Sequence, residues 1–404
     1  MRKSYLILAA VATILASCAE NSKINNDLRS DETKTVIGFS SYSEKATRSV
    51  DSPTDLEYYH NTFAVFATKA VTIDSQTEIQ NVFGEEADAT APVDGTTCTY
   101  VDGSATNPLF YDSNWKYTNE RFWDTRAIYD FIAYAPAAAP IKFQYSAADA
   151  RVKADGNKFV SDGAVTLYGQ NLQDGSKGTD AEIVKGFTSS DATNKKDIDI
   201  MVSALVADQD GRDYVRTQPR QDINLVFHHI LSKLNIRIAK DKFLDNVKIN
   251  IKSIELGGLK HVGTFGDENK VNKWNAADRE TNSEYALTFN KDNTESNWTE
   301  LPKYDYSNDV LKYKYFVESI VMPQVLPETC NLTVKYEIIS GSDTNNPHTE
   351  QYTSTTDISD SNIFTDFVEG YNYTLSVVIR PNVITFDASA AAWDTEGATI
   401  DINR

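Results

Sequence analysis

Residues 234–238 carry the sequence Leu-Asn-Ile-Arg-Ile, in which apolar and polar side chains alternate. Successive side chains of a β-strand point to opposite faces of a sheet, so the three apolar residues are predicted to face a core. Residues 247–251 (Val-Lys-Ile-Asn-Ile) repeat the pattern. The alternation then changes phase at Ser253 and Ile254, which predicts a β-bulge at that point.

Three further stretches have the character of strands. Residues 62–68 (TFAVFAT) form a short apolar run, and residues 126–136 (RAIYDFIAYAP) are apolar on both faces, as in the central strand of a sandwich. Residues 371–379 (YNYTLSVVI) alternate, with Tyr371 and every second residue after it predicted to point inward. Polar stretches rich in Gly, Asp, Asn, Ser and Thr, at 161–194 and 340–360, are predicted to be surface loops or hairpins with insertions.

Helical periodicity over three turns is hard to find, so the pattern predicts an all-β, antiparallel fold with two sandwiches in tandem. We expect the first domain to cover residues 35–240 and the second residues 241–404. The predicted boundary lies near Asp241, after the strand at Leu234, where few local signals mark it.

The chain is acidic, with a formal net charge of −19 in 404 residues. Phosphate backbones and anionic membrane surfaces repel such a charge, which excludes nucleic acid as a partner. Aromatic residues make up 11% of the chain, and Tyr (21) outnumbers Phe (18). This aromatic content favours β-structure.

The N-terminus has the features of an export signal. Arg2 and Lys3 precede an apolar stretch at 5–15 that is too short to cross a bilayer as a helix. Leu15-Ala16-Ser17-Cys18 then matches the bacterial lipobox, in which a peptidase cleaves before a cysteine whose sulfur carries lipid. We therefore expect residues 1–17 to be a lipoprotein signal peptide, Cys18 the lipidation site, and 18–34 a flexible tether at the outer membrane. An ordinary signal peptide with a chance cysteine is the alternative.

Motifs for catalysis or metal binding are not found. None of the five histidines lies in a metal-ligand spacing, and the chain has no nucleophile elbow, P-loop or dinucleotide fingerprint. His228 and His229 are adjacent in a strand and cannot grip one metal together. The sequence therefore predicts no catalytic residue, no metal, no cofactor and no enzyme, although a pair of catalytic carboxylates remains an open alternative among 58 acidic residues.

Several other polar and aromatic features have a structural explanation. Residues 208–213 faintly resemble a calcium loop, but the glycine falls at the fourth position rather than the sixth, so a hairpin turn is the preferred interpretation. Asp197 and Asp199 are expected on a solvated strand face. The five tryptophans are assigned mainly to core packing rather than to a sugar-binding platform. Cys98 and Cys330 are predicted to be unpaired, with a disulfide between them as the alternative.

A polar segment follows the first predicted strand, which opens at residues 36–39. Residues 44–53 (Glu-Lys-Ala-Thr-Arg-Ser-Val-Asp-Ser-Pro) place Arg48 in a loop that precedes a proline. Such a loop is accessible to proteases.

Several stretches, taken in order, resemble the fimbrillin-like (type V pilus) lipoproteins of the Bacteroidia. One departure is Ile230, where the family usually has alanine after its histidine. The stretches that carry the resemblance, beside the lipobox, are Trp115-Lys-Tyr117, Arg121-Phe-Trp123, residues 129–136 (YDFIAYAP), 197–204 (DIDIMVSA), 225–234 (LVFHHILSKL), 371–375 (YNYTL) and 393–397 (WDTEG).

This resemblance implies two transthyretin-like β-sandwiches in a pilus subunit exported as a lipoprotein. It implies that an arginine-specific protease cuts after the first strand, and that a neighbouring subunit's terminal strand fills the groove left behind, a form of β-augmentation. Carried over to this sequence, the leaving strand is about residues 35–41, the cut follows Arg48, and the donor strand comes from residues 382–402. Cys18 and its lipid would leave with the first strand, so the lipid would anchor only the precursor.

The expected partners are therefore other pilus subunits, the protease, and the outer membrane through Cys18, and the expected location is the cell-surface fimbrium. The alternative is a surface-anchored lipoprotein or pilus-tip adhesin that binds glycan or host protein through loops and exposed aromatic residues. A pilus subunit predicts a protease-dependent ladder of oligomers, whereas an adhesin predicts binding by the uncleaved monomer.

Overall fold

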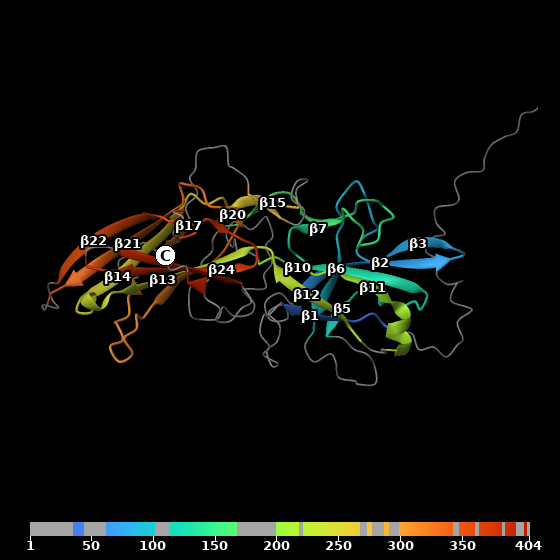
Figure 1. Ribbon diagram of the computed structural model, residues 1–404, viewed down its shortest axis with the longest axis horizontal. Helices are drawn as coiled ribbons and strands as arrows, with labels where there is room; N and C mark the ends of the chain where they lie inside the picture. Colours follow the sequence, from blue (N-terminus) through green and yellow to red (C-terminus); the bar gives the residue numbers. More distant parts are fainter. Residues whose placement is uncertain are drawn as a thin grey trace, which may run out of the picture.

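The computed structural model describes residues 35–43, 62–101, 114–167, 199–217, 221–266, 273–276, 287–290, 299–341, 347–359, 363–381, 384–392 and 400–401. Figure 1 shows an elongated body made almost wholly of strands. The N-terminal half, with β2, β6 and β12, lies at one end, and β14, β21 and β22 lie at the other. The predicted all-β fold of packed sheets is confirmed.

The N-terminal half is built on one nine-stranded sheet. Two of its strands lie beside the main path, where β3 (Gln76–Phe83) pairs with β2 and β11 (Val206–Asp210) pairs with β6. The main path runs, in order, through β1 (Phe39–Ser43), β12 (Ile223–His229), β10 (Met201–Ser203), β6 (Ala127–Ala135), β2 (Thr62–Ile73), β4 (Thr96–Tyr100) and β5 (Trp115–Tyr117).

Strands β2 and β6 lie at the centre of this sheet, and both faces of each strand are largely apolar and buried. On β2, Phe63 and Val65 enter one core while Ala64 and Phe66 enter another. A strand whose two faces both carry apolar side chains must be covered on both sides. The sequence-based prediction of a central sandwich strand at 126–136 is therefore confirmed.

The C-terminal half is a sandwich of two sheets with one shared core. The first sheet runs through β19 (Lys314–Val321), β13 (Ser232–Lys240), β24 (Tyr371–Ile379), β25 (Ile384–Ala392) and β26 (Ile400–Asp401). The second runs through β17 (Leu287–Asn290), β14 (Lys248–Gly257), β21 (Asn331–Ser340) and β22 (His348–Asp357), and β18 (Thr299–Glu300) also pairs with β14.

The opening stretch of the sequence lies at the heart of this sandwich. Leu234, Ile236 and Ile238 on β13 all reach the core between the two sheets. The register of β14 against β21 shifts between Ile251 and Ser253, so the predicted bulge is confirmed.

The prediction for the last long strand is partly wrong. Tyr373 and the alternate residues after it on β24 face the core, whereas Tyr371 is 39% exposed. Tyr371 is the first residue of β24 and lies beyond the edge of the core. The apolar alternation of the sequence therefore begins one position before the strand is covered by the facing sheet.

Several short strand pairs complete the fold, and one of them, β9 with β15, links the two halves. The pair β7 (Ile141–Gln144) and β8 (Lys158–Ser161) covers one face of the large sheet. Strand β9 (Val165–Thr166) pairs with β15 (Val262–Phe265), which pairs with β16 (Trp274–Ala276). Another short pair is β20 (Gln324–Val325) with β23 (Asp366–Phe367). The described helical segments are brief and include a π-helix at Asp213–Thr217 and a 3-10 helix at Lys242–Leu244.

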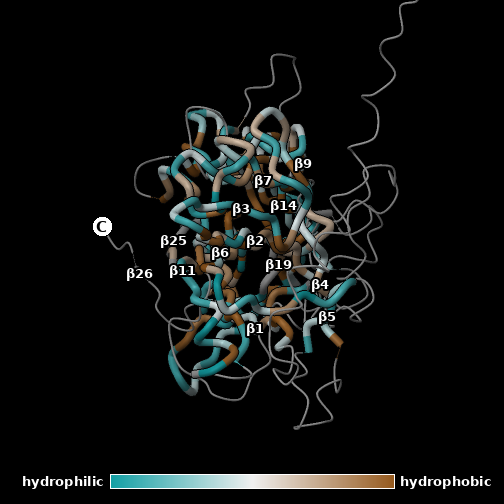
Figure 2. Tube along the Cα trace, turned by 90° about the vertical axis from the view of Figure 1, so that its right-hand side faces the viewer, coloured by the Kyte–Doolittle hydropathy of each residue, from teal (hydrophilic) through white to brown (hydrophobic). Residues whose placement is uncertain are grey.

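The core on this face contains residues from both halves, so the halves share buried surface. Phe66 and Phe143 lie in it together with Phe265 and Trp274. The Trp274 indole N–H donates to the Ile230 carbonyl over 2.6 Å. Figure 2, viewed from the end, shows apolar segments inside and polar segments mostly on the outer loops.

The division at residue 241 stays a prediction. Strand β13, which ends one residue before it, pairs with β19 and runs parallel to β24, both from the C-terminal half. We propose that the change from one half to the other lies between β12 and β13, near Ile230. The stretch 340–360, predicted to be a loop or a hairpin with insertions, holds the ten-residue strand β22.

Candidate functional site

Strand β1 and the residues just before it form one closing edge of the N-terminal sheet. Alternate side chains point into the core: Ile37 is 0%, Phe39 is 1% and Ser41 is 3% exposed. The segment carries few residues but buries two large apolar side chains. Each such side chain contributes about 1.5–3 kcal/mol when fully removed from water.

Phe39 sits in an aromatic cage. Its ring meets those of Phe63, Phe83, Tyr117 and Phe131 edge-on, with centroid separations of 5.8, 5.2, 5.9 and 6.1 Å respectively. Edge-to-face contacts of this kind add to the energy of burial. The four rings of the cage come from β2, β3, β5 and β6, so none of them belongs to the segment that fills it.

Two backbone partners hold this segment, each at a different part of it. From Phe39 onward β1 runs parallel to β12, with Phe39 opposite Ile223 and Ser43 opposite Phe227. Before that point the Ile37 N–H donates to the Arg121 carbonyl over 2.9 Å, and the Trp123 N–H donates to the Thr35 carbonyl over 3.0 Å. The segment therefore fills a slot between β12 and residues 121–123.

A tyrosine hydroxyl completes the slot. The Tyr117 hydroxyl donates to the Ile37 carbonyl over 2.7 Å. Burial raises the pKa of Tyr117 to about 12, so the phenol keeps its proton and remains a donor at neutral pH.

The wall at 121–123 is fixed by its own contacts. The Arg121 guanidinium lies 4.9 Å from the Phe83 ring centroid and donates to the Asn119 carbonyl over 2.6 Å. Trp123 stacks on Tyr214, with ring centroids 4.1 Å apart. These contacts do not involve β1, so the wall has supports other than the segment it borders.

The two predicted modification sites, Cys18 and Arg48, lie outside the described residues. The predicted leaving strand at 35–41 is described: β1 begins at Phe39, and Val36 makes an isolated bridge with Phe122.

The predicted donor segment, 382–402, contains β25 and β26. Strand β25 pairs antiparallel with β24 from Ile379↔Ile384 to Tyr371↔Ala392. Strand β26 pairs with β25 at two positions. In the single chain, then, the described parts of this segment lie in their own sandwich and not at β1.

The two cysteines of the described chain are unpaired and lie in different cores. Cys98 belongs to the core that contains Phe39, and Cys330 belongs to the C-terminal sandwich. Burial raises the pKa of the Cys98 thiol well above its usual value and that of Cys330 to about 12. Both thiols are therefore protonated and unreactive while the cores are intact.

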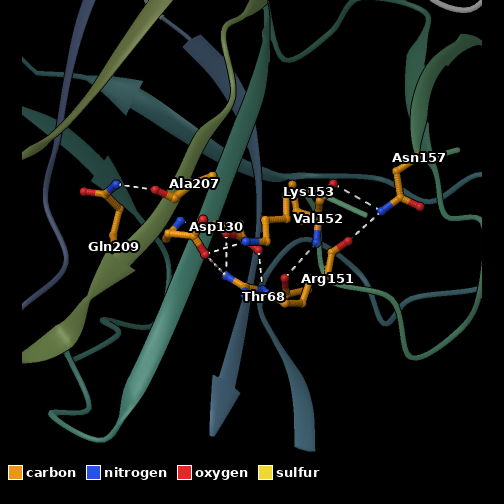
Figure 3. Close-up of polar contacts among 9 residues, drawn as sticks. Thr68, Asp130, Arg151, Val152, Lys153, Asn157, Ala207 and Gln209 are labelled. Carbon is orange, nitrogen blue, oxygen red and sulfur yellow. Dashed lines mark hydrogen bonds and ion pairs between the residues drawn. The ribbon is translucent and has the colours of Figure 1, made fainter. Parts of the chain in front are cut away.

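A buried ion pair that the sequence analysis missed fixes the sheet on its other side. Asp130, on β6, is 0% exposed and accepts two hydrogen bonds from Arg151, of 2.7 and 2.6 Å. It also accepts the Asp208 N–H over 3.0 Å. Figure 3 shows Asp130 beside Arg151, with Thr68 and Val152 next to them. Next to Arg151, the Val152 N–H donates to the Thr68 hydroxyl over 2.9 Å. The sequence did contain a signal for this ion pair, because Asp130 is an acidic residue within an apolar strand pattern. A buried carboxylate needs a charged or hydrogen-bonding partner, and that requirement predicts one nearby.

The remaining candidates have structural roles. Asp208 lies in a β-bulge of β11 with a φ of 56°, and its carboxylate pairs with Lys153 and Arg151 instead of forming a calcium loop. His229 is buried with Nδ1 2.7 Å from an Asp199 oxygen, so Asp199 is not on the purely solvated face that was expected. His228 is exposed, on the opposite face. The three described tryptophans, Trp115, Trp123 and Trp274, are all buried, as predicted.

Within the described ranges, no group of three or more His, Cys, Asp or Glu side chains could hold a metal ion. The same ranges contain no helix that is both long and apolar enough to cross a membrane.

The chain belongs to the fimbrillin-like family, whose model matches residues 47–393. No curated protein matches it. Among solved structures it is similar to a fimbrial protein from Bacteroides vulgatus, with 16% identity, a TM-score of 0.55, and coverage of 89% of this chain and 99% of that one. Two structures described as putative cell adhesion proteins also match, and each match covers 90% of this chain. The one from Bacteroides uniformis is fully covered, with 14% identity and a TM-score of 0.43; the one from Bacteroides ovatus is 98% covered, with 14% identity and a TM-score of 0.40.

Membership of the fimbrillin-like family supports a structural role in a cell-surface fimbria or in adhesion. Because the fimbrial protein from Bacteroides vulgatus is only 16% identical to this chain, the similarity between the two structures supports a shared fold and no more.

Proposed function

We propose that this protein is a pilus subunit that is exported as a lipoprotein through Cys18 and polymerises by donor-strand exchange after cleavage at Arg48. The observation that carries the proposal is the slot around β1. A short segment buries Ile37 and Phe39 in the core, and its backbone bonds first to residues 121–123 and then to β12. Loss of this segment would leave open hydrogen-bonding groups and an apolar groove, which is what an incoming strand needs.

The sequence of the donor segment supports its fit to this slot. The inward residues of the leaving segment are Ile37, Phe39 and Ser41, with the order Ile-x-Phe-x-small. Residues 384–388 (Ile-Thr-Phe-Asp-Ala) have the same order. Because side chains alternate along a strand, a donor in this register would place Phe386 in the cage of Phe39 and Ala388 in the position of Ser41.

Release of the donor segment is a necessary step in this proposal. Strand β25 would have to leave β24, where it pairs in the single chain. The exchange would replace its backbone bonds with equivalent bonds to β12, while apolar side chains enter the groove.

The Arg48→Ala variant is expected to remain monomeric when an arginine-specific protease is added, while the wild-type protein gives a ladder of oligomers. The reason is that an uncut connection keeps β1 in its slot. The measurement is an electrophoretic ladder on exposure to the protease, and normal polymers from Arg48→Ala would overturn the assignment of this residue.

Thiol labelling gives a control within the same molecule. Release of β1 opens the core that holds Cys98, so its labelling rate is expected to rise after cleavage. Cys330 lies in the other sandwich and is expected to stay unreactive. In the cleaved monomer, where β25 still pairs with β24, equal rises at both cysteines would indicate general unfolding instead of release of β1.

Cleavage at Arg48 would also separate the lipidated Cys18 from the rest of the subunit. After cleavage at Arg48, Cys18 would leave with β1, and the subunit would be free to assemble. A subunit that is not cleaved would stay anchored in the outer membrane, at the base of a pilus.

A further inference from the structure

Ser41 is the polar member of the inward-facing row on the segment around β1. It is 3% exposed, and it lies opposite Leu225 in the parallel register with β12. Residues opposite each other in a parallel pair point to the same face of the sheet, so Ser41 faces the core that holds Leu225 and Phe39. A hydroxyl is therefore placed among apolar side chains.

This hydroxyl has no hydrogen-bond partner in the part of the chain that the structure describes, although its oxygen is fully buried. Other buried serines of the fold are satisfied. The Ser203 hydroxyl accepts the Ala133 N–H over 2.8 Å, and the Ser232 hydroxyl donates to the Val368 carbonyl over 2.7 Å. A hydroxyl that leaves water without a new partner costs free energy, so Ser41 weakens the hold of the core on its own segment.

The segment proposed as the donor lacks this defect. In the register proposed above, the first two inward positions have the same residues in both segments, isoleucine and then phenylalanine. The third position differs, with Ser41 in the leaving segment and Ala388 in the donor. Alanine is serine without the hydroxyl, so the donor fills this position without burying an unpaired polar group.

We propose that Ser41 is a weak point of the leaving segment, which allows a donor strand with alanine at the same position to displace it. This inference rests on the proposed function and adds the residue that favours the donor over the leaving strand. Before cleavage the covalent connection keeps the segment at a high effective concentration beside its slot, so the weak point has little effect. After cleavage the segment depends on its contacts alone, and the cost of the buried hydroxyl then promotes its release.

A stability measurement on the uncleaved protein tests whether the hydroxyl has this cost. In the Arg48→Ala background, Ser41→Ala is expected to raise the urea midpoint of the N-terminal half, because it removes a buried polar group without a partner. Ser40→Ala, one residue earlier on the same strand and pointing to the other face, is the matched control and is expected to leave the midpoint unchanged. An unchanged or lower midpoint for Ser41→Ala overturns the inference.

A kinetic measurement tests whether the same hydroxyl controls the exchange. In the chain that retains Arg48, gel filtration at timed intervals after protease cleavage measures how much of the N-terminal fragment is still bound. Ser41→Ala is expected to slow release of the fragment about tenfold, the factor that corresponds to the cost of one unpaired buried hydroxyl. The oligomer ladder should form correspondingly later, and Ser40→Ala should behave as the wild type.

The reciprocal variant places the hydroxyl in the donor. Ala388→Ser is expected to leave release of the N-terminal fragment unchanged, because the leaving segment is intact, and to lower the urea concentration at which the ladder dissociates. A ladder that forms normally, with equal release rates for Ser41→Ala, Ser40→Ala and the wild type, overturns this inference and leaves the proposed function intact. A wild-type chain that is cleaved at Arg48 and gives no ladder overturns the proposed function, and this inference with it.

Discussion

Replacing Phe39 with alanine is expected to lower the free energy of unfolding of the uncleaved N-terminal half by about 3–5 kcal/mol. The ring is 1% exposed and contacts four aromatic side chains, so its removal loses the energy of burial and leaves a cavity. Urea titration followed by tryptophan fluorescence measures this loss, since Trp115 and Trp123 lie in the same core.

The Ser40→Ala variant is the matched control, because Ser40 lies on the same strand, points away from the Phe39 side and is only partly buried. Its expected effect is within about 0.5 kcal/mol, the usual range for surface substitutions. The Phe39→Ala variant also separates two states of the protein. If β1 leaves on assembly, assembled subunits should have wild-type stability, and a weakened polymer would show that Phe39 remains in place.

The Asp130→Ala variant should destabilise the uncleaved and the assembled protein alike, by about 3–5 kcal/mol. Its loss leaves the Arg151 guanidinium, with 20% of its side chain exposed, without its bidentate partner, and leaves the Asp208 N–H without an acceptor. A buried charge without a partner costs more than the pair contributes. Heat or urea unfolding of both forms provides the measurement.

Two further variants define the cause of this loss. Asp208→Ala removes an exposed partner of Arg151 and Lys153, and is expected to cost less than about 1 kcal/mol. Arg151→Met combined with Asp130→Ala is expected to recover much of the stability, because no charge is then left unpaired. If the double variant is no more stable than Asp130→Ala alone, the loss comes from packing and not from the ion pair.

The strands that could be predicted from the sequence are those with one apolar face or two. The alternation at 234–238, the bulge near Ser253 and the central strand at 126–136 all follow from side chains that must leave water. Strand β22 was not predicted, because its two faces are exposed and its sequence has no apolar period. Backbone hydrogen bonds to β21 hold this strand in place, and such bonds do not require any particular pattern of side chains in the sequence.

The pairing of strands was less predictable than their existence. The sequence pattern favoured antiparallel sheets, yet β1 runs parallel to β12 and β13 runs parallel to β24. Parallel pairs join segments far apart in the chain, and local patterns do not encode such contacts. For the same reason the slot around β1 needed the structure, since its wall at 121–123 is more than 80 residues from Phe39.

The family resemblance placed a leaving segment at 35–41, where the structure buries Ile37, Phe39 and Ser41. That this segment leaves stays a prediction. Neither Cys18 nor Arg48 lies in the described chain, so lipidation and cleavage rest on the sequence and on the experiments proposed above.

A disulfide across the proposed junction tests the central claim most directly. Asn224 on β12 faces Ser40 on β1, and in the register proposed for the donor Asp387 takes the place of Ser40. A chain with Asn224→Cys and Asp387→Cys is expected to form covalent multimers after protease cleavage and oxidation, and reduction should dissolve them. The uncleaved Ser40→Cys with Asn224→Cys variant, which should form a disulfide within one chain, confirms that the geometry permits the bond. Polymers that assemble without a disulfide between residues 224 and 387 would contradict the account.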